Sequence, residues 1–172
     1  MIPEAIKNLI GTSGAVQYYQ VEKGAIRRFA DAVDDTNPLY RDEEYAGKTK
    51  YGSIIAPPGF FGWPQKQTRG SPLAVDIPPE LEAAFEKAGY PLSLVLDGGM
   101  EYEFFLPVFA GDILSAVTTV RNLRERTGET GSIIVSFLDT VYHNQTGALV
   151  AKQQLMFVRR SLDQPPKETD NA

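Results

Sequence analysis

The sequence predicts an α+β fold in which helices come first and a single antiparallel sheet follows. Before residue 90, apolar residues repeat at helical spacing, as Ile26, Phe29, Ala30 and Val33 do at i, i+3, i+4 and i+7. After residue 92 the chain instead carries β-type runs that turn signals such as Ala110-Gly111-Asp112 separate. Helices followed by a strand meander are typical of α+β domains rather than of doubly wound sheets.

The individual elements follow from these periodicities. Helices are expected at residues 3–10, 23–34, 43–46 and 80–88. Strands are expected at residues 15–21, 93–106, 112–124, 132–143 and 148–159. In the 132–143 strand one face is apolar throughout and the other is mixed, and in the last strand Gln153 interrupts an otherwise apolar face.

Two connecting segments complete the predicted fold. Residues 52–64 combine apolar bulk with prolines and glycines, which suits an element that begins at a tight turn and covers one face of the sheet. Residues 65–79 are polar and contain proline, and are expected to form a loop. A five-stranded antiparallel sheet wrapped around a central helix is the outline of a hot-dog fold. One domain is expected over residues 1–160, followed by a disordered polar tail at 161–172.

Composition excludes several classes of function. The net charge of −5 argues against nucleic acid as a partner. The chain has no cysteine and its only histidine is His143, so thiolate chemistry and a multi-histidine metal site are excluded, and no metal is expected. His143 is expected to be an exposed turn residue. No apolar stretch approaches the ~20 residues that span a bilayer and no signal peptide is visible, so a cytoplasmic protein without a membrane partner is expected.

A dense polar cluster between residues 31 and 44 is the strongest candidate site. Composition alone also allows helix capping on a solvated surface, although the Asn37-Pro38 turn before Tyr40 suits a pocket equally well. The stretch FADAVDDTNPLYRDEEYA (Phe29–Ala46) resembles the F-A-x-x-x-G-D-x-N-P-x-H-x-D signature of the MaoC-like, (R)-specific enoyl-CoA hydratases and 3-hydroxyacyl dehydratases. In that family the aspartate and histidine form a catalytic dyad at the mouth of an acyl tunnel.

Two later segments extend the resemblance over residues 15–160. YGSIIAPPGFF (Tyr51–Phe61) is similar to the start of the family's central helix, and LDGGMEYEFFLPVFAGDIL (Leu96–Leu114) to a strand and turn that end in Gly-Asp. The APP form at 56–58 and the tyrosine at position 40 resemble the N-terminal, non-catalytic half of these proteins. The resemblance implies a hot-dog fold, an acyl-CoA thioester as substrate and no cofactor beyond the CoA of that thioester.

Carried over by residue, the resemblance puts Asp35 at the position of the catalytic aspartate and Tyr40 at that of the histidine. Hydration of an enoyl thioester needs a base for water and an acid for the α-carbon, which the family shares between Asp, His and one water. Histidine exchanges a proton near its ordinary pKa of ~6.5, whereas tyrosine at ~10 is a poor substitute. Three roles therefore remain open for Asp35: a relic of the dyad, a turn residue at the end of the helix, or a weak base.

The remaining candidate site residues would bind substrate. They are Asn37, Pro57, Gly59 and Gly98. The N–H of Gly59 could bind a thioester oxygen, but the need for glycine in a tight turn explains this residue equally well. For Gly98 the alternative is that glycine relieves crowding in a bent strand. The 80–88 helix is interpreted as a cover over the acyl groove, with ordinary core packing as the alternative.

Three functions remain open at this stage. The first is a subunit that shapes the acyl-CoA tunnel while a MaoC-like partner chain supplies the Asp/His dyad. The second is a self-sufficient homodimeric hydratase that uses Asp35 and Tyr40, and the third is a non-catalytic acyl-CoA binding module. A hot-dog monomer leaves a sheet edge exposed, so at least a dimer is expected, either a homodimer or a hetero-oligomer. The acyl group itself is not predicted.

Overall fold

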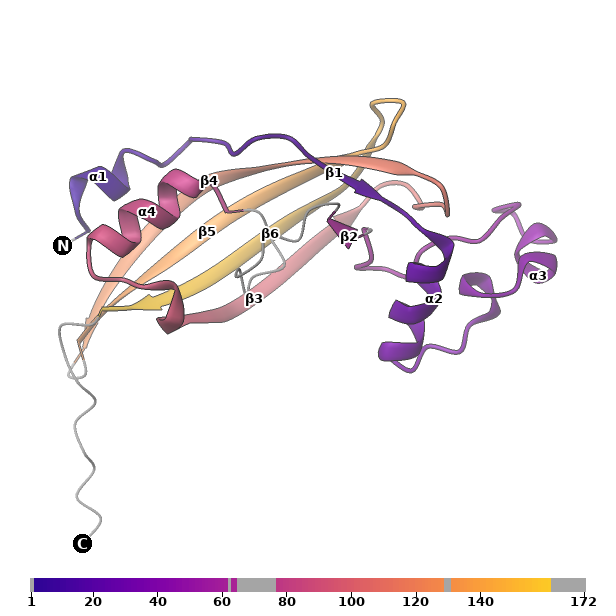
Figure 1. Cartoon of the computed structure of the whole chain (residues 1–172), viewed down its shortest axis with the longest axis horizontal. Helices are drawn as coiled ribbons and strands as arrows, with labels where there is room; N and C mark the ends of the chain where they lie inside the picture. The colour runs from indigo at the N-terminus through magenta and orange to yellow at the C-terminus, as the bar shows by residue number, and fades with distance from the viewer. Residues whose placement is uncertain (1, 62, 65–76, 129–130, 162–172) are drawn as a thin grey trace, which may run out of the picture.

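The computed structural model describes residues 2–61, 63–64, 77–128 and 131–161 (Figure 1). Its helices are α1 (Glu4–Lys7), α2 (Lys23–Ala32), α3 (Glu43–Gly47) and α4 (Pro79–Lys87), with 3₁₀ turns η1 (Pro38–Tyr40) and η2 (Leu92–Leu94). Its strands are β1 (Gln17–Gln20), β2 (Trp63–Pro64), β3 (Val95–Phe104), β4 (Ile113–Gly128), β5 (Gly131–His143) and β6 (Leu149–Arg160). The loop predicted at 65–79 lies outside the described residues up to position 76, as does the tail after Ser161.

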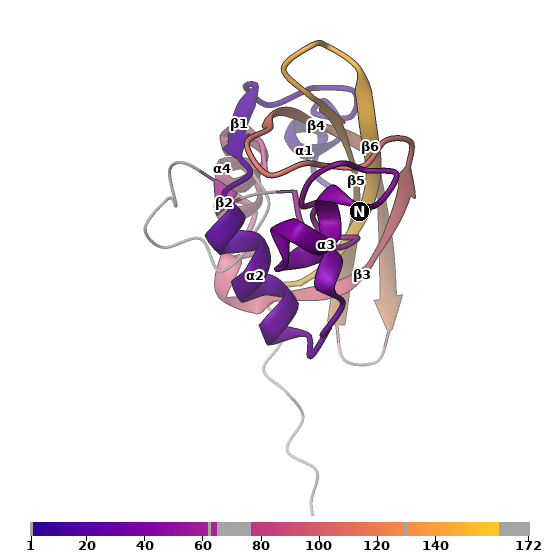
Figure 2. The ribbon, with the colours of Figure 1, turned by 90° about the vertical axis from the view of Figure 1, so that its right-hand side faces the viewer.

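The strands form one antiparallel sheet in the order β2-β1-β4-β5-β6-β3. All five predicted strands are present, and the two-residue strand β2 adds a sixth at the β1 edge. The α+β class is therefore confirmed. Helices α1 and α4 lie over one end of the sheet, whereas α2 and α3 gather beyond its other end (Figures 1 and 2).

The two faces of the sheet differ in burial. On β5 the mixed face, with Ile134, Ser136 and Leu138, is fully buried, while the uniformly apolar face is only half-buried. The helix-covered face thus carries polar side chains, which must find partners inside the protein because an unpaired buried polar group costs about 1–3 kcal/mol.

Two separate apolar clusters cover the buried face. One joins α1 and α4 to the sheet through fully buried side chains that include Ile6, Leu81 and Phe85. The other joins α2, η1 and residues 54–61 to the opposite end of the sheet. The 80–88 helix thus takes part in core packing, through Leu81 and Phe85.

The helix on the buried face is supplied by a later segment than expected. Residues 52–61 and 63–64 contain no helix, although residues 54–61 cover one end of the sheet as expected, and the helix on the buried face is α4, over the opposite end. Ile55 instead bridges Phe109, and the Ala56 N–H donates to the Val108 carbonyl at 2.8 Å. Pro57 and Pro58 favour this extended path, because proline lacks an N–H and disfavours helix in the residue before it.

Candidate functional site

The three motif residues lie together in the turn between α2 and α3. The Asp35 N–H closes the end of α2 on the Ala30 carbonyl at 2.8 Å, after Asp34 adopts a left-handed backbone with φ of 55°. The half-buried Asp35 carboxylate then accepts the N–H of Asn37 at 3.0 Å. One step on, the Asn37 side chain accepts the N–H of Leu39 at 3.0 Å and so caps η1. Asx turns of this kind fix the backbone between Asp35 and Tyr40.

Tyr40 ends η1 with its side chain 8% exposed, in the apolar cluster that also contains Phe61 and Tyr142. Burial raises the pKa of its phenol, and the negative charge of Asp35 and the nearby Tyr51 raise it further. Tyr40 therefore stays protonated at neutral pH. Among the described contacts no hydrogen bond joins the Tyr40 hydroxyl to the Asp35 carboxylate, so the pair lacks the link of a working acid–base dyad.

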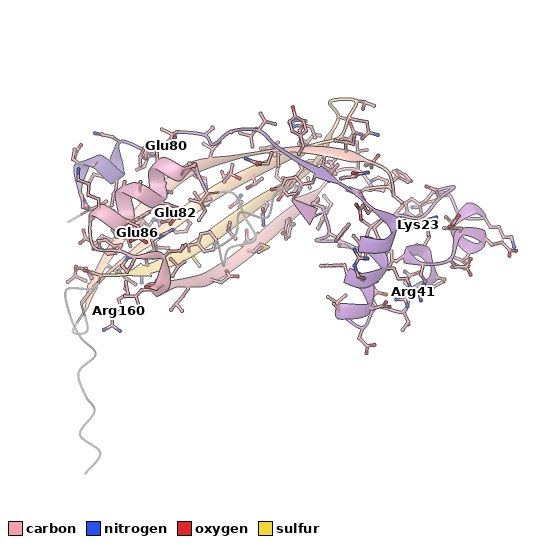
Figure 3. All side chains as sticks on the ribbon, in the orientation of Figure 1. Lys23, Arg41, Glu80, Glu82, Glu86 and Arg160 are labelled. Atoms are coloured by element: carbon pink, nitrogen blue, oxygen red, sulfur yellow. The ribbon has the colours of Figure 1, made fainter. Side chains whose placement is uncertain are left out.

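Arg41 is a site residue that sequence reasoning missed. Its Nη1 pairs with the Asp31 carboxylate at 2.9 Å, and its Nη2 donates to the carbonyl of Asp35. The guanidinium thus ties α2 to the turn and holds Asp35 from the backbone side. Figure 3 shows Arg41 at the end of the molecule where α2 and α3 lie, far from α4 and its glutamates. An arginine six residues after the aspartate was the only sign of this contact in the sequence.

The other predicted residues fall into two places. Pro57 is buried, and its carbonyl accepts the Phe60 N–H at 3.1 Å, while Gly59 has φ of +88°, a value that requires glycine in a tight turn. Both lie beside Ala56 and Phe60, which share the cluster of Tyr40. Gly98 lies apart from this group, at a bulge of β3 where an added Cβ would meet Met156 at 3.1 Å. Their role in substrate binding stays a prediction.

The position of His143 differs from the exposed turn that the sequence predicted. It is the last residue of β5, at a register irregularity opposite Leu149, and is half-buried rather than exposed. It belongs to the strand and not to the turn that follows, because the ladder with β6 extends as far as this residue.

A polar row crosses the buried face of the sheet and was also missed. It consists of Thr118, Thr140, Gln153 and Tyr102, which lie opposite one another on β4, β5, β6 and β3. The two threonine hydroxyls share a hydrogen bond of 2.9 Å, and Gln153 bonds to both Tyr102 and Tyr142. The only sequence signal was Gln153, the exception on an apolar face.

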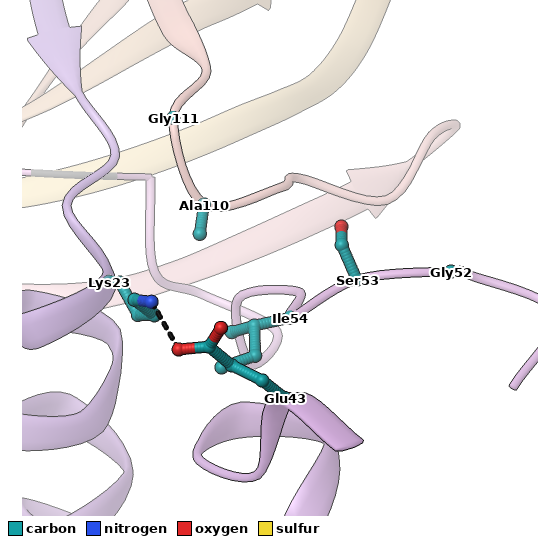
Figure 4. A pocket seen from close by; sticks show the side chains of 7 residues that line it. All are labelled: Lys23, Glu43, Gly52, Ser53, Ile54, Ala110 and Gly111. Atoms are coloured by element: carbon teal, nitrogen blue, oxygen red, sulfur yellow. Dashed lines mark hydrogen bonds and ion pairs between the residues drawn. The ribbon is translucent and has the colours of Figure 1, made fainter. Parts of the chain in front are cut away.

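A pocket of about 400 Å³ lies between the starts of α2 and α3 (Figure 4). Its lining comes from the start of α2, from α3, from residues 52–54 and from the turn at Ala110-Gly111. Lys23 pairs with Glu43 across it, so the pocket presents a neutral ion pair. The structure shows no cluster of three acidic or histidine side chains able to hold a metal within the described residues. None of the helices in the described part of the chain is long and apolar enough to cross a membrane.

Comparison with known proteins assigns the family. A family model described as the FAS1-like dehydratase domain region matches residues 8–153. A UPF0336 protein of Thermobifida fusca is 34% identical over 110 residues, which are 64% of this chain and 66% of that protein, so the match spans just under two thirds of the relative. A probable enoyl-CoA hydratase alpha subunit of Thermomonospora curvata is 30% identical over 154 residues, 84% of this chain but only 45% of the relative.

Solved structures agree on the fold. The ChsH1-ChsH2 complex of Mycobacterium tuberculosis contains a chain with a TM-score of 0.74 at 18% identity, covering 98% of this chain and 97% of that one. The C-terminally truncated HadBC (3R)-hydroxyacyl-ACP dehydratase of the same organism gives a TM-score of 0.61 at 23% identity, with 87% and 96% coverage. With its antiparallel sheet, its Asp-x-Asn-Pro turn and this family match, the chain belongs to the FAS1-like dehydratase family and has the hot-dog fold of the MaoC-like hydratases and dehydratases.

Proposed function

We propose that this chain is the non-dyad subunit of an (R)-specific enoyl-CoA hydratase or 3-hydroxyacyl-thioester dehydratase. It shapes and lines the acyl tunnel, while a MaoC-like partner chain supplies the catalytic Asp and His. Water then adds across the C2=C3 bond of the enoyl thioester: the partner's dyad takes a proton from water, hydroxide joins C3, and a proton joins C2. The reaction needs no cofactor beyond the CoA carried by the substrate.

The observation that carries this proposal is Tyr40. The backbone of the motif turn is retained, with the Asp35 and Asn37 side chains both bonded to it. The residue at the histidine position, however, is a buried phenol whose raised pKa keeps it neutral. With an ordinary pKa of ~10 already, fewer than about one phenol in 10³ is ionised at pH 7, so Tyr40 has no base to offer. A retained turn with a disabled acid–base group fits a subunit better than a self-sufficient enzyme.

The β3 edge of the sheet supports a partner chain. β3 bonds only to β6 among the described strands, so its other side presents unpaired backbone groups. Met100 and Phe104 on this strand are 46% and 49% exposed, and Phe105 and Leu106 after it are exposed as well. A long apolar edge is an association site in a native protein, because left bare it promotes aggregation. The related complexes described as ChsH1-ChsH2 and HadBC, and the relative named as an alpha subunit, are consistent with a heteromeric assembly.

The test is a complex of this chain with a dyad-bearing MaoC-like chain. Asp35→Asn in this chain should leave the hydration rate of the complex within about twofold, since substitutions away from the reacting atoms change little. Replacing the dyad aspartate of the partner should lower it by about 10²–10⁴-fold. Asp34→Asn, at the exposed neighbour, is the matched control. If Asp35→Asn abolished the activity of the complex while Asp34→Asn did not, this chain would be catalytic and the proposal would be wrong.

A further inference from the structure

The polar row on the buried face separates the two apolar clusters. On one side of it lie Tyr142 and Ala151 of the cluster around Tyr40, and on the other lie Leu138 and Leu155 of the cluster under α4. Thr118, Thr140 and Gln153 of the row are fully buried, and no member of the row carries a charge. A hydrogen-bonding layer of this kind costs desolvation unless every donor and acceptor is satisfied.

At one end of the row, the hydrogen-bond geometry leaves the O–H of Tyr102 without an acceptor among the described residues. The Tyr142 hydroxyl donates to Gln153 Oε1 at 3.0 Å, and Gln153 Nε2 donates to the Tyr102 hydroxyl oxygen at 2.9 Å. The Tyr102 oxygen therefore acts as acceptor, and within the described residues its own O–H has no acceptor. Burial raises the pKa of Tyr102, which keeps that proton in place. The amide of Gln153 thus orients Tyr102 as a donor.

Tyr102 is also partly exposed among the described residues. It is half-buried on the edge strand β3, between the exposed side chains of Met100 and Phe104 on the same face. Its ring lies 5.3 Å from that of Phe61, which stacks on Tyr142 at 4.4 Å in the cluster that contains Tyr40. A chain that enters beside Tyr40 and runs along the buried face would meet Tyr102 at the boundary between the clusters.

We propose that the Tyr102 hydroxyl binds and positions the acyl group by donating a hydrogen bond to one of its oxygens. The inference rests on the proposed function, namely that this chain lines an acyl tunnel. Because the row is neutral and apolar clusters flank it, a neutral oxygen suits it better than a phosphate of CoA. The oxygen is the thioester carbonyl or the 3-hydroxyl of a hydroxyacyl group, and Tyr102 is a positioning residue that exchanges no proton with it.

Calorimetry of the binding of three CoA derivatives to the full chain distinguishes the two oxygens. S-butyl-CoA has neither oxygen, butyryl-CoA has the carbonyl, and 3-hydroxybutyryl-CoA has both. If Tyr102 binds the carbonyl, Tyr102→Phe should weaken the binding of butyryl-CoA and of 3-hydroxybutyryl-CoA by about two- to tenfold, because a neutral hydrogen bond contributes that much. If Tyr102 binds the 3-hydroxyl, only the binding of 3-hydroxybutyryl-CoA should weaken. S-butyl-CoA should bind equally to both proteins. Tyr18→Phe, at an exposed tyrosine of β1, is the matched control.

An infrared spectrum of bound, carbonyl-labelled butyryl-CoA adds a readout that a packing role would not move. If the carbonyl is bound, its stretch should shift to lower frequency in the wild type and return toward the solution value in Tyr102→Phe. Unchanged affinities for all three ligands in Tyr102→Phe would overturn the inference and leave the proposed function intact. A wild-type chain, alone and with its partner, that binds none of the three would overturn the proposed function itself.

Discussion

The buried ion pair between Arg159 and Glu82 fastens α4 to the last strand, and removing either partner alone should cost more stability than removing both. Arg159 is 1% exposed on β6 and its Nη2 pairs with Glu82 Oε1, whose side chain is 24% exposed. The guanidinium also lies over the Phe85 ring at 4.5 Å. Within the described residues Arg159 Nε and Nη1 and Glu82 Oε2 have no hydrogen-bond partner. The pair therefore carries a large desolvation cost that its geometry offsets only in part.

The loss of stability in each variant depends on which charge remains. Glu82→Leu leaves a fully buried cation unpaired and should lower the free energy of unfolding by about 3–5 kcal/mol. Arg159→Met removes the contact with Phe85 but leaves a carboxylate on a side chain that is 24% exposed, so a smaller loss of about 2–4 kcal/mol is expected. The double variant removes both charges and fills the space with apolar groups, and should lie within about 1 kcal/mol of the wild type.

Urea unfolding at pH 7, followed by far-ultraviolet circular dichroism, measures all four proteins. In thermal unfolding followed by the same signal, Glu82→Leu should lower Tm by about 6–20 °C for a domain of this size. The double variant should be more stable than either single variant by at least about 1 kcal/mol. A double variant as unstable as the sum of the two single changes would mean that the residues act through independent packing, and the electrostatic reasoning would be refuted.

Three further outcomes are expected. Tyr40→His should raise crotonyl-CoA hydration by the isolated chain by about 10²-fold or more, since histidine titrates near ~6.5; a rate equal to that of Tyr40→Phe would show that position 40 is not the missing group. Burial raises the pKa of Tyr102 and Tyr40 above their unfolded values, so the contribution of these two phenols to the free energy of unfolding should be constant below about pH 10 and fall above it. Urea titrations from pH 7 to 11 check this, and the fall should be shallower in Tyr102→Phe. Gly98→Ala should cost about 1–3 kcal/mol in the same assay, because its Cβ would meet the Met156 backbone carbonyl at 3.1 Å; an unchanged midpoint would contradict that steric account.

The sheet was predictable because alternation and turn signals are local. Each predicted strand is present, and η1 falls at the Asn37-Pro38 turn that the motif indicated. The central element was predicted less well: apolar bulk at 52–61 indicated a cover for the sheet, and residues 54–61 do pack there, but Pro57 and Pro58 hold the segment extended, and α4 supplies a helix over the opposite end of the sheet.

The polar row could not be predicted because it depends on register. Thr118, Thr140, Gln153 and Tyr102 lie on four strands, and their alignment depends on how each pair of strands slides. Irregularities at Val120/Asn122 and Asp97/Gly99 shift these ladders by residues that no local pattern specifies. Gln153 alone was visible as an oddity, and a single polar residue on an apolar face does not reveal its partners. Arg41 was missed for a similar reason, since its partner is a backbone carbonyl.

The most direct test of the account is the loss of enoyl-thioester absorbance when the purified, folded chain meets crotonyl-CoA and longer enoyl-CoAs without a partner. The account predicts a rate at least about 10²-fold below that of a dyad-bearing relative, because Tyr40 replaces a general acid–base group. It also predicts that the rate rises when a dyad-bearing chain is added. Turnover by the isolated chain within about tenfold of the relative, a difference of only about 1.4 kcal/mol, would mean that Asp35 and Tyr40 suffice and that the subunit assignment is wrong.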